Sequence, residues 1–389
     1  MNNAILNKNV QSFIVNYTDP TSNLAFAGSP FLEITVQELI QQIESRRKIE
    51  TKLPTWYTQN SVYFAPKLNL EQTSSELTAI YKASLVNGDS LADITGGFGV
   101  DSYYFSKKIK SVDCFEINKE LSQISKHNFD ILENRNIQCF NTNGLDEVLK
   151  RSYDVIYADP SRRHDKKGKV YLLEDCEPNI PKNMVQLLQR SKILMLKTSP
   201  MLDLTAGMNS LSGVFQIHIV AVNNEVKELI WILSKDAPLL PDIYTINIKN
   251  CSSEKFNFKW NATTETSFHK PLRYLYEPNA AILKSGAFNI LSKEFEVYKL
   301  HKHSHLYTSN TLQEFPGRRF VITNLISYTK SDIKRNIGFK KANITTRNFP
   351  ESVASLRKRW KINDGGDNYL FFTTIANEQK VVIVCSKVT

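Results

Sequence analysis

A glycine-rich turn in the first half of the chain has the residue types of a ligand-binding loop. From Leu91 to Asp101 the sequence reads Leu-Ala-Asp-Ile-Thr-Gly-Gly-Phe-Gly-Val-Asp, so an apolar strand leads into the turn and a helix follows. Glycines let a backbone turn sharply and approach a ligand without a Cβ atom in the way. The free amides and the dipole at the start of the helix favour a polar or anionic group.

Two polar segments follow later strands. Glu116 ends the second expected strand about 20 residues past the glycines, where a carboxylate can accept hydrogen bonds from two ribose hydroxyls. The segment Asp159-Pro160-Ser161-Arg162-Arg163 follows the fourth expected strand. Ligands of open α/β sheets bind outside the carboxyl ends of the strands, so we expect these groups at the same edge as the turn.

A nicotinamide dinucleotide fold is the competing interpretation of this turn. The run from Gly97 to Ser102 lacks the third small residue that dehydrogenases use for close packing of helix on strand. The Asp-Pro segment after the fourth strand also has no role in that fold. Both features favour a different cofactor.

The motifs together resemble a family of bacterial class I methyltransferases that carry a C-terminal THUMP-like domain. The resembling stretches are Leu70–Glu76 with Tyr81–Ala83, Thr95–Asp101, Tyr157–Arg163 and Asp364–Asp367. The resemblance implies S-adenosyl-L-methionine as cofactor and, by analogy with THUMP modules, an RNA substrate such as tRNA or rRNA. It supplies no established reaction. The implied cofactor-binding residues are Gln72, Ser74, Asp93, Thr95, Gly96, Gly97, Gly99, Asp101, Glu116, Ile117, Asn143, Gly144 and Asp159.

Within this resemblance, Asn143-Gly144-Leu145-Asp146 is similar to the motif that contacts adenine, with Asn143 in place of the commoner aspartate. Ser74 and Ser75 precede a helix, so N-capping is an equally good role for them.

The implied catalytic residues are Asp159, Pro160 and Arg162. In amino-group methyltransferases, the side chain of the first residue and the carbonyl after it hold the target nitrogen toward the methyl group. An aromatic residue usually stands fourth and stacks on the base, whereas this chain has Arg162, which can stack on a base or bind a phosphate. The alternative is that Asp159 caps a loop and that Arg162 and Arg163 lie on a solvated turn.

The same segment is similar to Asp-Pro-Pro-Arg of uracil-C5 RNA methyltransferases, which need a cysteine nucleophile after the fifth strand. That place reads Lys197-Thr198-Ser199-Pro200, without cysteine. We therefore expect direct in-line transfer to a nitrogen or an oxygen. The basic run from Lys166 to Lys169 is expected to be a mobile loop that closes over a substrate.

The elements that must position these residues alternate strands with helices from Ser90 onward, which predicts a doubly wound α/β domain. Two further strands, Phe215–Asn223 and Val226–Ser234, join at a tight Asn223-Asn224 turn and predict an antiparallel end to the sheet. The expected earlier strands are Ser90–Ile94, Ser111–Glu116, Ile137–Asn141, Tyr153–Ala158 and Ser191–Leu196. The expected helices are Asp101–Lys108, Asn118–Glu133, Gly144–Lys150 and Ile180–Gln189.

The flanking regions are expected to be separate. Thr35 and Glu38 predict a capping box at the start of one helix. A helix up to Val86 is expected to present Leu77, Ile80, Tyr81 and Leu85 on one face. Pro238–Pro241 reads as a boundary. The predicted parts are a helical region (1–88), a Rossmann-like methyltransferase domain (89–238), a small α+β domain (239–328) and a basic THUMP-like domain (329–389).

The charge of the chain favours a polyanionic partner. Its 389 residues carry a formal net charge of +10, and lysine and arginine gain by displacing counterions from phosphates. The aromatics among the late basic residues, Phe339, Phe349 and Trp360, are expected to anchor a core. The basic residues are Lys330, Lys334, Arg335, Lys340, Lys341, Arg347, Arg357, Lys358, Arg359 and Lys361.

Metal, membrane and disulfide chemistry are not expected. The five cysteines are scattered and never form a C-x-x-C pair, which fits reduced thiols in the cytoplasm. His301, His303 and His305 alternate, and a surface strand explains them better than a metal site. The apolar runs are far shorter than the ~20 residues needed to cross a bilayer.

The leading hypothesis is therefore an S-adenosylmethionine-dependent methyltransferase of an RNA nucleobase, located in the cytoplasm. One alternative is a methyltransferase of a protein or small molecule. Another is a non-catalytic protein that binds the cofactor and RNA. A last one is transfer of the aminocarboxypropyl group of the same cofactor.

Overall fold

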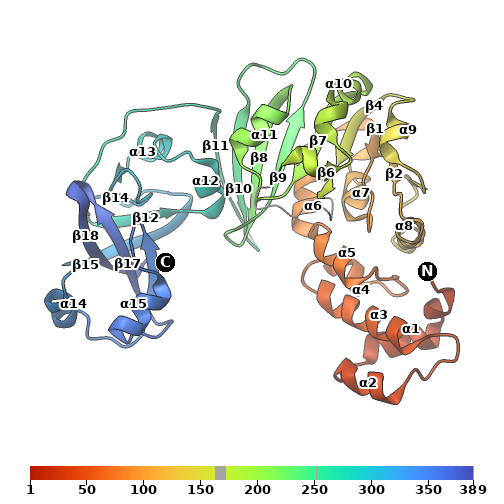
Figure 1. Cartoon of the computed structure of the whole chain (residues 1–389), viewed down its shortest axis with the longest axis horizontal. Helices are drawn as coiled ribbons and strands as arrows, with labels where there is room; N and C mark the ends of the chain where they lie inside the picture. The colour runs from red at the N-terminus through yellow and green to blue at the C-terminus, as the bar shows by residue number, and fades with distance from the viewer. Residues whose placement is uncertain (163–171, 251, 389) are drawn as a thin grey trace. The chain divides into compact units, whose positions relative to one another are not determined.

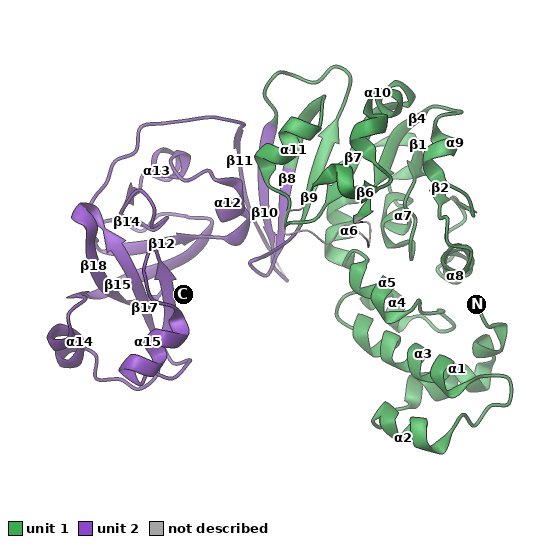
Figure 2. Ribbon diagram, viewed as in Figure 1, with its two compact units in different colours: residues 1–217, 228–241 green, residues 218–227, 242–389 purple. Residues whose placement is uncertain are grey.

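The computed structural model describes residues 1–389 except 163–171, 251 and 389. The chain divides into two compact units, which Figure 2 distinguishes by colour. Unit 1 comprises residues 1–217 and 228–241, and unit 2 comprises residues 218–227 and 242–389. Each unit has its own buried core, and each is described by itself.

Unit 1 begins with short helices, drawn in red and orange in Figure 1. The predicted capping box is confirmed: Thr35 Oγ1 accepts from the Glu38 amide (3.2 Å), and Glu38 Oε2 accepts from the Thr35 amide (2.9 Å). The helices are η1 (Asn3–Leu6), α1 (Lys8–Asn16), α2 (Thr21–Ala27), α3 (Val36–Ile49), α4 (Pro54–Thr58), α5 (Lys67–Gln72) and α6 (Glu76–Ala83).

The predicted buried face of α6 is wrong. Leu77 and Ile80 are 39% and 47% exposed, whereas Lys82 is fully buried. The helix buries Thr78, Ala79, Lys82 and Ala83 instead. The prediction from apolar periodicity failed because Lys82 occupies a core position. Periodicity expects leucine or isoleucine there, and a lysine can take that place only when its charge is paired inside the protein.

The nine-stranded sheet that contains the parallel strands of unit 1 has the predicted α/β class, and its strands β10 and β11 belong to unit 2. Strands β1, β2, β3, β4 and β7 pair in parallel, and β9 runs antiparallel to β7. The order is β11-β10-β8-β9-β7-β4-β1-β2-β3. The strands are β1 (Gly88–Asp93), β2 (Ile109–Phe115), β3 (Ile137–Phe140), β4 (Tyr153–Ala158), β7 (Ser191–Thr198), β8 (Val214–Val222), β9 (Glu225–Leu233), β10 (Asp242–Ile248) and β11 (Ser253–Lys259).

Helices connect the parallel strands, and the central strand β4 is buried on both faces, as in other doubly wound sheets. Val155 and Ile156 on β4 have no exposed surface although they point to opposite faces. The short pair β5 (Ser161–Arg162) and β6 (Cys176–Glu177) stands apart from the sheet. The connecting elements are α7 (Val100–Phe105), α8 (Lys119–Ile131), α9 (Gly144–Val148), η2 (Leu173–Asp175), α10 (Ile180–Arg190) and α11 (Leu204–Ser210).

The turn between β8 and β9 is as expected, because Asn223 and Asn224 both have positive φ (49° and 66°). Such backbone angles suit a two-residue hairpin, and asparagine tolerates them better than most residues. Strands β10 and β11, which follow the expected boundary at Pro238–Pro241, belong to the same sheet. The division into compact units nevertheless falls after Pro241. The expected domain limits stay predictions.

Unit 2 contains a second sheet with the order β13-β14-β12-β15-β18-β17-β16. The aromatics Phe339, Phe349 and Trp360 pack against its core, as predicted. The strands are β12 (Tyr274–Pro278), β13 (Tyr298–Lys299), β14 (Tyr307–Ser309), β15 (Gly317–Ser327), β16 (Asn343–Arg347), β17 (Asn368–Ile375) and β18 (Gln379–Lys387). The helices are α12 (Ala280–Ser285), α13 (Ile290–Glu294), α14 (Lys330–Asn336), α15 (Val353–Trp360) and η3 (Ala376–Glu378).

The surface strand expected for the three alternating histidines is wrong. His301, His303 and His305 lie in a turn between β13 and β14, and His305 has a φ of 51°. His301 is buried and contacts Glu378 through Nε2 at 2.9 Å. The alternating spacing of the three histidines therefore does not indicate one face of a strand. It belongs to a turn in which His301 contacts Glu378.

Candidate active site

The glycine turn folds around a carboxylate from the next strand. Glu116 follows β2, and its Oε2 accepts a hydrogen bond from the Gly97 amide at 2.7 Å. Gly97 and Gly99 have φ of 54° and 86°, and Gly99 is the N-cap residue of α7. Those angles suit glycine, and a Cβ on Gly99 would lie 2.5 Å from Cζ of Phe129. The turn therefore needs glycine for both conformation and space.

Asp93, the last residue of β1, is hydrogen-bonded to residues on both sides of the glycine turn. Its Oδ1 accepts from the Thr95 amide (3.0 Å), and its Oδ2 accepts from the Ser102 hydroxyl (2.6 Å). Burial raises the pKa of Asp93 to about 7, although those hydrogen bonds oppose the shift. A carboxylate in this position fixes the path of the turn.

The turn is joined directly to the Asp-Pro segment. The Asp159 amide donates to Thr95 Oγ1 at 2.7 Å, and Asp159 Oδ2 accepts from Lys197 Nζ at 2.6 Å. The side chains of Asp159 and Lys197 are 29% and 14% exposed. Asp159 follows β4 and Lys197 lies near the end of β7, so two neighbouring parallel strands bring the charges together. Among the described residues, Lys197 contacts Asp159 through Oδ2 and no lysine pairs with its Oδ1.

Burial favours the neutral form of Lys197, but the nearby carboxylates favour its charged form more strongly. Asp159, Glu228 and Asp101 raise the pKa of Lys197 above its ordinary value. Lys197 is therefore a cation at every physiological pH, and it does not act as a proton acceptor.

A buried charge network lies behind the turn and centres on Lys82 of α6. Lys82 Nζ donates to Ser74 Oγ (2.8 Å) and to both carboxylate oxygens of Glu228 on β9 (2.9 Å each). It also lies 3.1 Å from Oδ1 of Asp101, at the start of α7. Lys82 is 0% exposed and Glu228 3% exposed. An internal cation of this kind is stable only because several acceptors surround it.

Asp101 receives two further hydrogen bonds on its other oxygen. Ser74 Oγ and the Tyr157 hydroxyl lie 2.9 and 2.7 Å from Asp101 Oδ2. Burial alone would raise the pKa of Asp101, but Lys82, Lys197 and these hydrogen bonds outweigh it and the pKa is lowered. Asp101 is thus an anion within the network.

Sequence reasoning missed Lys82, Lys197 and Glu228 as site residues. Lys197 had a usable signal, because it stands at the end of an apolar strand beside the strand that ends at Asp159. Glu228 comes directly before the apolar run Leu229–Leu233 of β9, where a charged residue gives no special signal. Lys82 looked like an ordinary polar position of an amphipathic helix.

The remaining predicted cofactor residues occupy two regions of this edge. Ile117 is 76% exposed beside Glu116. Asn143 is exposed and caps α9 by accepting from the Leu145 amide at 3.1 Å. Gly144 packs so tightly that a Cβ there would lie 2.6 Å from Cα of Ile94. These groups follow β2 and β3, on the far side of the turn from Asp159.

The serines before α6 have different roles. Ser75 is its N-cap and accepts from the Thr78 amide at 3.3 Å. Ser74 is buried and joins Lys82 to Asp101, as described above. Gln72 is exposed at the end of α5.

The basic residues after Asp159 are only partly described. Pro160 is buried, and the backbone of Arg162 pairs with Cys176 in the β5–β6 ladder. Arg163 and the basic run from Lys166 to Lys169 lie outside the described residues.

The site has groups that fit a cofactor with a ribose, an adenine and an amino-acid part. A carboxylate offers about four acceptor positions, so Glu116 retains capacity beyond its bonds to the Gly97 and Asn118 amides (2.7 Å each). Ile117 offers an exposed apolar side chain beside it. Asp101 Oδ1 is buried without a hydrogen bond, since Lys82 meets it at ion-pair distance only. The Lys82 ammonium is the charge partner of that oxygen in the structure.

Fold and site together define a class I methyltransferase architecture: a mostly parallel sheet with an antiparallel end strand, a glycine turn after β1, and a polar Asp-Pro segment after β4. The chain is similar over its whole length to a Porphyromonas gingivalis W83 protein described as a methyltransferase. The two share 31% identity, 99% of this chain and 98% of that chain are covered, and the TM-score is 0.89. The chain belongs to this methyltransferase family, whose members carry a C-terminal THUMP-like domain.

Two family models match within unit 2. One describes a ferredoxin-like domain and covers residues 274–316, and the other describes a THUMP-like domain and covers residues 317–387. The second begins at 317, whereas the sequence analysis placed the start of the basic domain at 329. A search of curated proteins found no match.

More distant solved structures cover only part of the chain. A Pyrococcus horikoshii protein described as an RNA methyltransferase has 15% identity and a TM-score of 0.33, with 49% of this chain and 97% of that chain covered. A Streptococcus mutans methyltransferase in complex with SAH has 15% identity and a TM-score of 0.30, with 41% and 96% covered. Structures this dissimilar do not inform the function of this chain.

Neither a metal-binding cluster nor a membrane-spanning helix is found in the described part of the chain. It contains no group of three or more His, Cys, Asp or Glu side chains that could hold a metal ion. None of its helices is long and apolar enough to cross a membrane.

The predicted basic surface of unit 2 is smaller than the sequence suggested. Four of its arginines form ion pairs: Arg335 with Asp332, Arg347 with Glu277, Arg357 with Asp364 and Arg359 with Glu351. The six lysines are exposed, and the described residues include no ion-pair partner for any of them. They are Lys330, Lys334, Lys340, Lys341, Lys358 and Lys361.

Proposed function

We propose that this chain is an S-adenosyl-L-methionine-dependent methyltransferase that modifies a nucleobase of RNA by direct in-line transfer. The observation that carries the proposal is the Thr95–Asp159–Lys197 connection, because it joins the Asp159 carboxylate to the glycine turn and so supports a role for Asp159 in holding the acceptor. The family assignment supports methyl transfer as the class of reaction.

The cofactor is held, in this proposal, by the turn and by the groups around it. Glu116 binds the ribose hydroxyls, Ile117 packs on the adenine, and Asn143 and Gly144 border the base. Asp101 accepts from the ammonium of the methionine part through the Oδ1 atom that has no hydrogen bond. S-adenosylmethionine, when bound, supplies an electrophilic methyl group.

The chain itself orients the acceptor. Asp159 and the Pro160 carbonyl accept hydrogen bonds from the target amino group and hold its lone pair in line. Lys197 holds one oxygen of Asp159, so the other oxygen is the one that is presented to the acceptor. The end of β7 and the residues directly after it read Lys197-Thr198-Ser199-Pro200, without the cysteine that a C5 methyltransferase needs there, which supports transfer to nitrogen or oxygen.

RNA as the substrate is supported by the match to a THUMP-like domain and by the six exposed lysines of unit 2. A protein or small-molecule substrate is the second candidate, and a non-catalytic protein that binds cofactor and RNA is the third. Transfer of the aminocarboxypropyl group would use the same cofactor residues, so the test must distinguish the transferred group.

The test is mass spectrometry of nucleosides from digested RNA of cells with and without this gene, with the cofactor labelled on its methyl carbon. We expect one labelled nucleoside to disappear with the gene, to return with the wild-type gene, and to stay absent with Asp159→Ala. Asp130→Asn, at an exposed acidic residue on α8, serves as the matched control and should restore it.

Other results would redirect the proposal. A gene-dependent nucleoside that is heavier by an aminocarboxypropyl group and carries no methyl label would identify the other transfer. An unchanged RNA profile, with cofactor binding by the purified protein, would favour a protein or small molecule as substrate. Full rescue by Asp159→Ala would remove Asp159 from the mechanism.

A further inference from the structure

Unit 2 contains a buried lysine whose charge no carboxylate neutralises. Lys299 at the end of β13 is only 2% exposed. Its Nζ donates to Asn289 Oδ1 (3.1 Å) and to the Lys302 carbonyl (3.2 Å), and both acceptors are uncharged. Among the described residues it has no ion-pair partner, whereas buried lysines are almost always paired. Burial accordingly lowers the pKa of Lys299.

A histidine with an unused ring nitrogen lies in the same turn. His305 stacks on Phe288 with ring centroids 3.6 Å apart, and its Nδ1 is buried without a hydrogen-bond partner. Burial, followed by the positive charges of Lys299 and Arg347 and by His303, lowers the pKa of His305 to about 4. The electrostatic potential at the His305 ring is therefore positive.

The third group is an arginine that a buried carboxylate holds in place. Arg347 at the end of β16 donates to Glu277 Oε1 through Nε (3.1 Å) and Nη2 (2.9 Å). Its Nη1 makes no hydrogen bond to any described residue, and the side chain is 32% exposed. Glu277 also pairs with Arg318, whose Nε lies 2.6 Å from Oε2. Glu277 is thus shared by two arginines.

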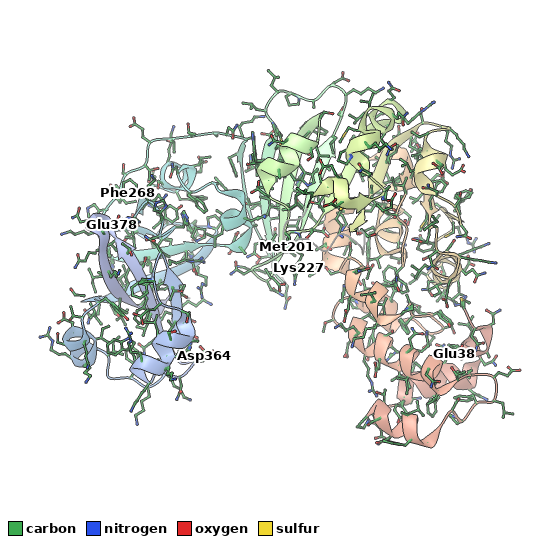
Figure 3. The ribbon with its side chains drawn as sticks, viewed as in Figure 1. Glu38, Met201, Lys227, Phe268, Asp364 and Glu378 are labelled. Carbon is green, nitrogen blue, oxygen red and sulfur yellow. The ribbon has the colours of Figure 1, made fainter. Side chains whose placement is uncertain are left out.

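Hydrogen bonds fix the histidine turn against the end of β16. Asn348, the residue after Arg347, lies with its Nδ2 3.0 Å from Nδ1 of His301. The Ser304 hydroxyl donates to the Thr374 carbonyl. Phe268 and Glu378, labelled in Figure 3, border the same region, because Phe268 pairs with Lys299 and Glu378 contacts His301. The three groups therefore belong to one ordered part of unit 2.

The charges of this region do not balance. Arg318 and Arg347 share one buried carboxylate, Glu277, and Lys299 contacts no carboxylate among the described residues. Glu378 is the other carboxylate in contact with the turn, but it is 81% exposed and binds His301 instead. The excess is two positive charges beside an unpartnered imidazole nitrogen. A phosphate carries one to two negative charges and several strong acceptor oxygens.

We propose that Lys299, His305 and Arg347 form a binding site for a phosphate group, and that this phosphate belongs to an RNA strand. Arg347 Nη1 and the His305 ring contact the phosphate oxygens, and Lys299 supplies charge from within the fold. Lys299 and His305 lie in the segment matched as ferredoxin-like, and Arg347 in the segment matched as THUMP-like. The site thus needs both segments.

The RNA part of this inference rests on the proposed function, whereas phosphate binding does not. The first experiment therefore uses inorganic phosphate and the full chain labelled at its histidine rings, followed by NMR. The His305 signal, assigned with His305→Asn, is expected to shift and saturate with phosphate, but not with chloride at equal ionic strength. His127, bonded through Nε2 to the Ser61 carbonyl in unit 1, is the internal reference.

Variants separate the site from general charge. Arg347→Gln and Lys299→Met are expected to abolish the phosphate-dependent shift, and Arg347→Gln provides the test if the buried Lys299 variant does not fold. Lys358→Met, an exposed lysine on α15 in the same unit, should keep the shift. An unchanged His305 signal in phosphate, or equal shifts of His305 and His127, would overturn the site.

The second experiment identifies the source of the phosphate. Binding of one RNA is measured with its 5′ end phosphorylated and dephosphorylated, for wild type and Arg347→Gln. We expect Arg347→Gln to weaken binding of the phosphorylated RNA about tenfold, since a charge-assisted bond is lost. The same loss with dephosphorylated RNA would assign an internal phosphate. Equal affinity of both proteins for RNA, with phosphate binding intact, would overturn the RNA part alone. Cofactor titration in parallel shows whether unit 1 is intact.

Discussion

At the scale of single residues, the Asp159–Lys197 ion pair distinguishes this site from one built on a lone carboxylate. Asp159 is fixed at its amide by Thr95 and at Oδ2 by Lys197, so the direction of its carboxylate is defined. The sequence predicted Asp159 from its motif. It did not predict Lys197, because no motif places a lysine there and only the pairing of β4 with β7 brings the two together.

Replacing Lys197 should therefore lower turnover more than cofactor binding. In Lys197→Met, Asp159 loses its orienting partner, and we expect kcat to fall about 10- to 100-fold, as for lost positioning of a reacting group. Lys197→Arg should recover part of the rate because it restores the ion pair. The measurements are single-turnover methylation rates and the Kd of the cofactor. A cofactor Kd that rises as much as kcat falls would contradict a positioning role.

Asp93 should make stability depend on pH in an unusual direction. Its pKa is raised from 3.8 to about 7, so the folded protein binds a proton that the unfolded chain has lost between these values. The contribution of Asp93 is thus present below pH ~4 and disappears as pH rises through ~7, by on the order of 4 kcal/mol. Urea unfolding between pH 4 and 8 should show a flatter profile for Asp93→Asn than for wild type. Parallel profiles would contradict a raised pKa.

At the scale of elements, the order of strands and helices in unit 1 follows from the sequence, and the helix faces do not. Strand β4 spans Tyr153–Ala158, as predicted. The prediction succeeded because a strand that is buried on both faces appears in the sequence as a continuous apolar run. Helix α6 was assigned the wrong face because its core position is taken by Lys82, whose acceptors come from β9 and α7. No local pattern contains that information.

The turn before α7 should not accept alanine at Gly99. Its φ is 86° and a Cβ would lie 2.5 Å from Phe129, whereas Gly286 has a φ of 74° and nothing within 4 Å. Gly286→Ala adds only backbone strain, about 1 kcal/mol, and Gly99→Ala adds a steric clash of about 1–3 kcal/mol. Chemical denaturation of both variants checks this. Equal losses of stability would show that Phe129 moves aside.

The network around Lys82 should respond unequally to loss of its members. Lys82→Met leaves two carboxylates, Asp101 and Glu228, without their buried cation, and we expect a loss of about 3–5 kcal/mol. Glu228→Gln should cost less because Asp101 still pairs with Lys82. In the double variant the losses should be far from additive. Additive losses in urea unfolding would mean that the two residues do not interact.

At the scale of the whole molecule, chemistry and charge belong to different units. The cofactor turn and Asp159 lie in unit 1, and the exposed lysines lie in unit 2. Net charge and the late basic run predicted this separation. They could not show that four of the arginines are used in ion pairs, since each partner is fixed only by the folded structure.

RNA binding and cofactor binding should therefore be separable. Replacing Lys334, Lys341 and Lys358 by glutamine should reduce the slope of log Kd for RNA against log salt by about 0.7 for each phosphate that a lysine no longer neutralises. The Kd of the cofactor should not change. Exposed lysines of unit 1 (Lys8, Lys119 and Lys126) serve as the matched set. Equal effects of the two sets would point to non-specific attraction.

The pairing of Lys82 with Glu228 also sets an order of events during synthesis. Lys82 emerges from the ribosome 146 residues before the glutamate that neutralises it. At usual elongation rates the delay is on the order of ten seconds. During that time only Asp101 and Ser74 can meet the lysine, so the charge network around α6 and α7 lacks one of its two carboxylates. The nascent cofactor site matures only when β9 has been made, so ribosome-bound chains that stop before residue 228 should be unable to bind the cofactor.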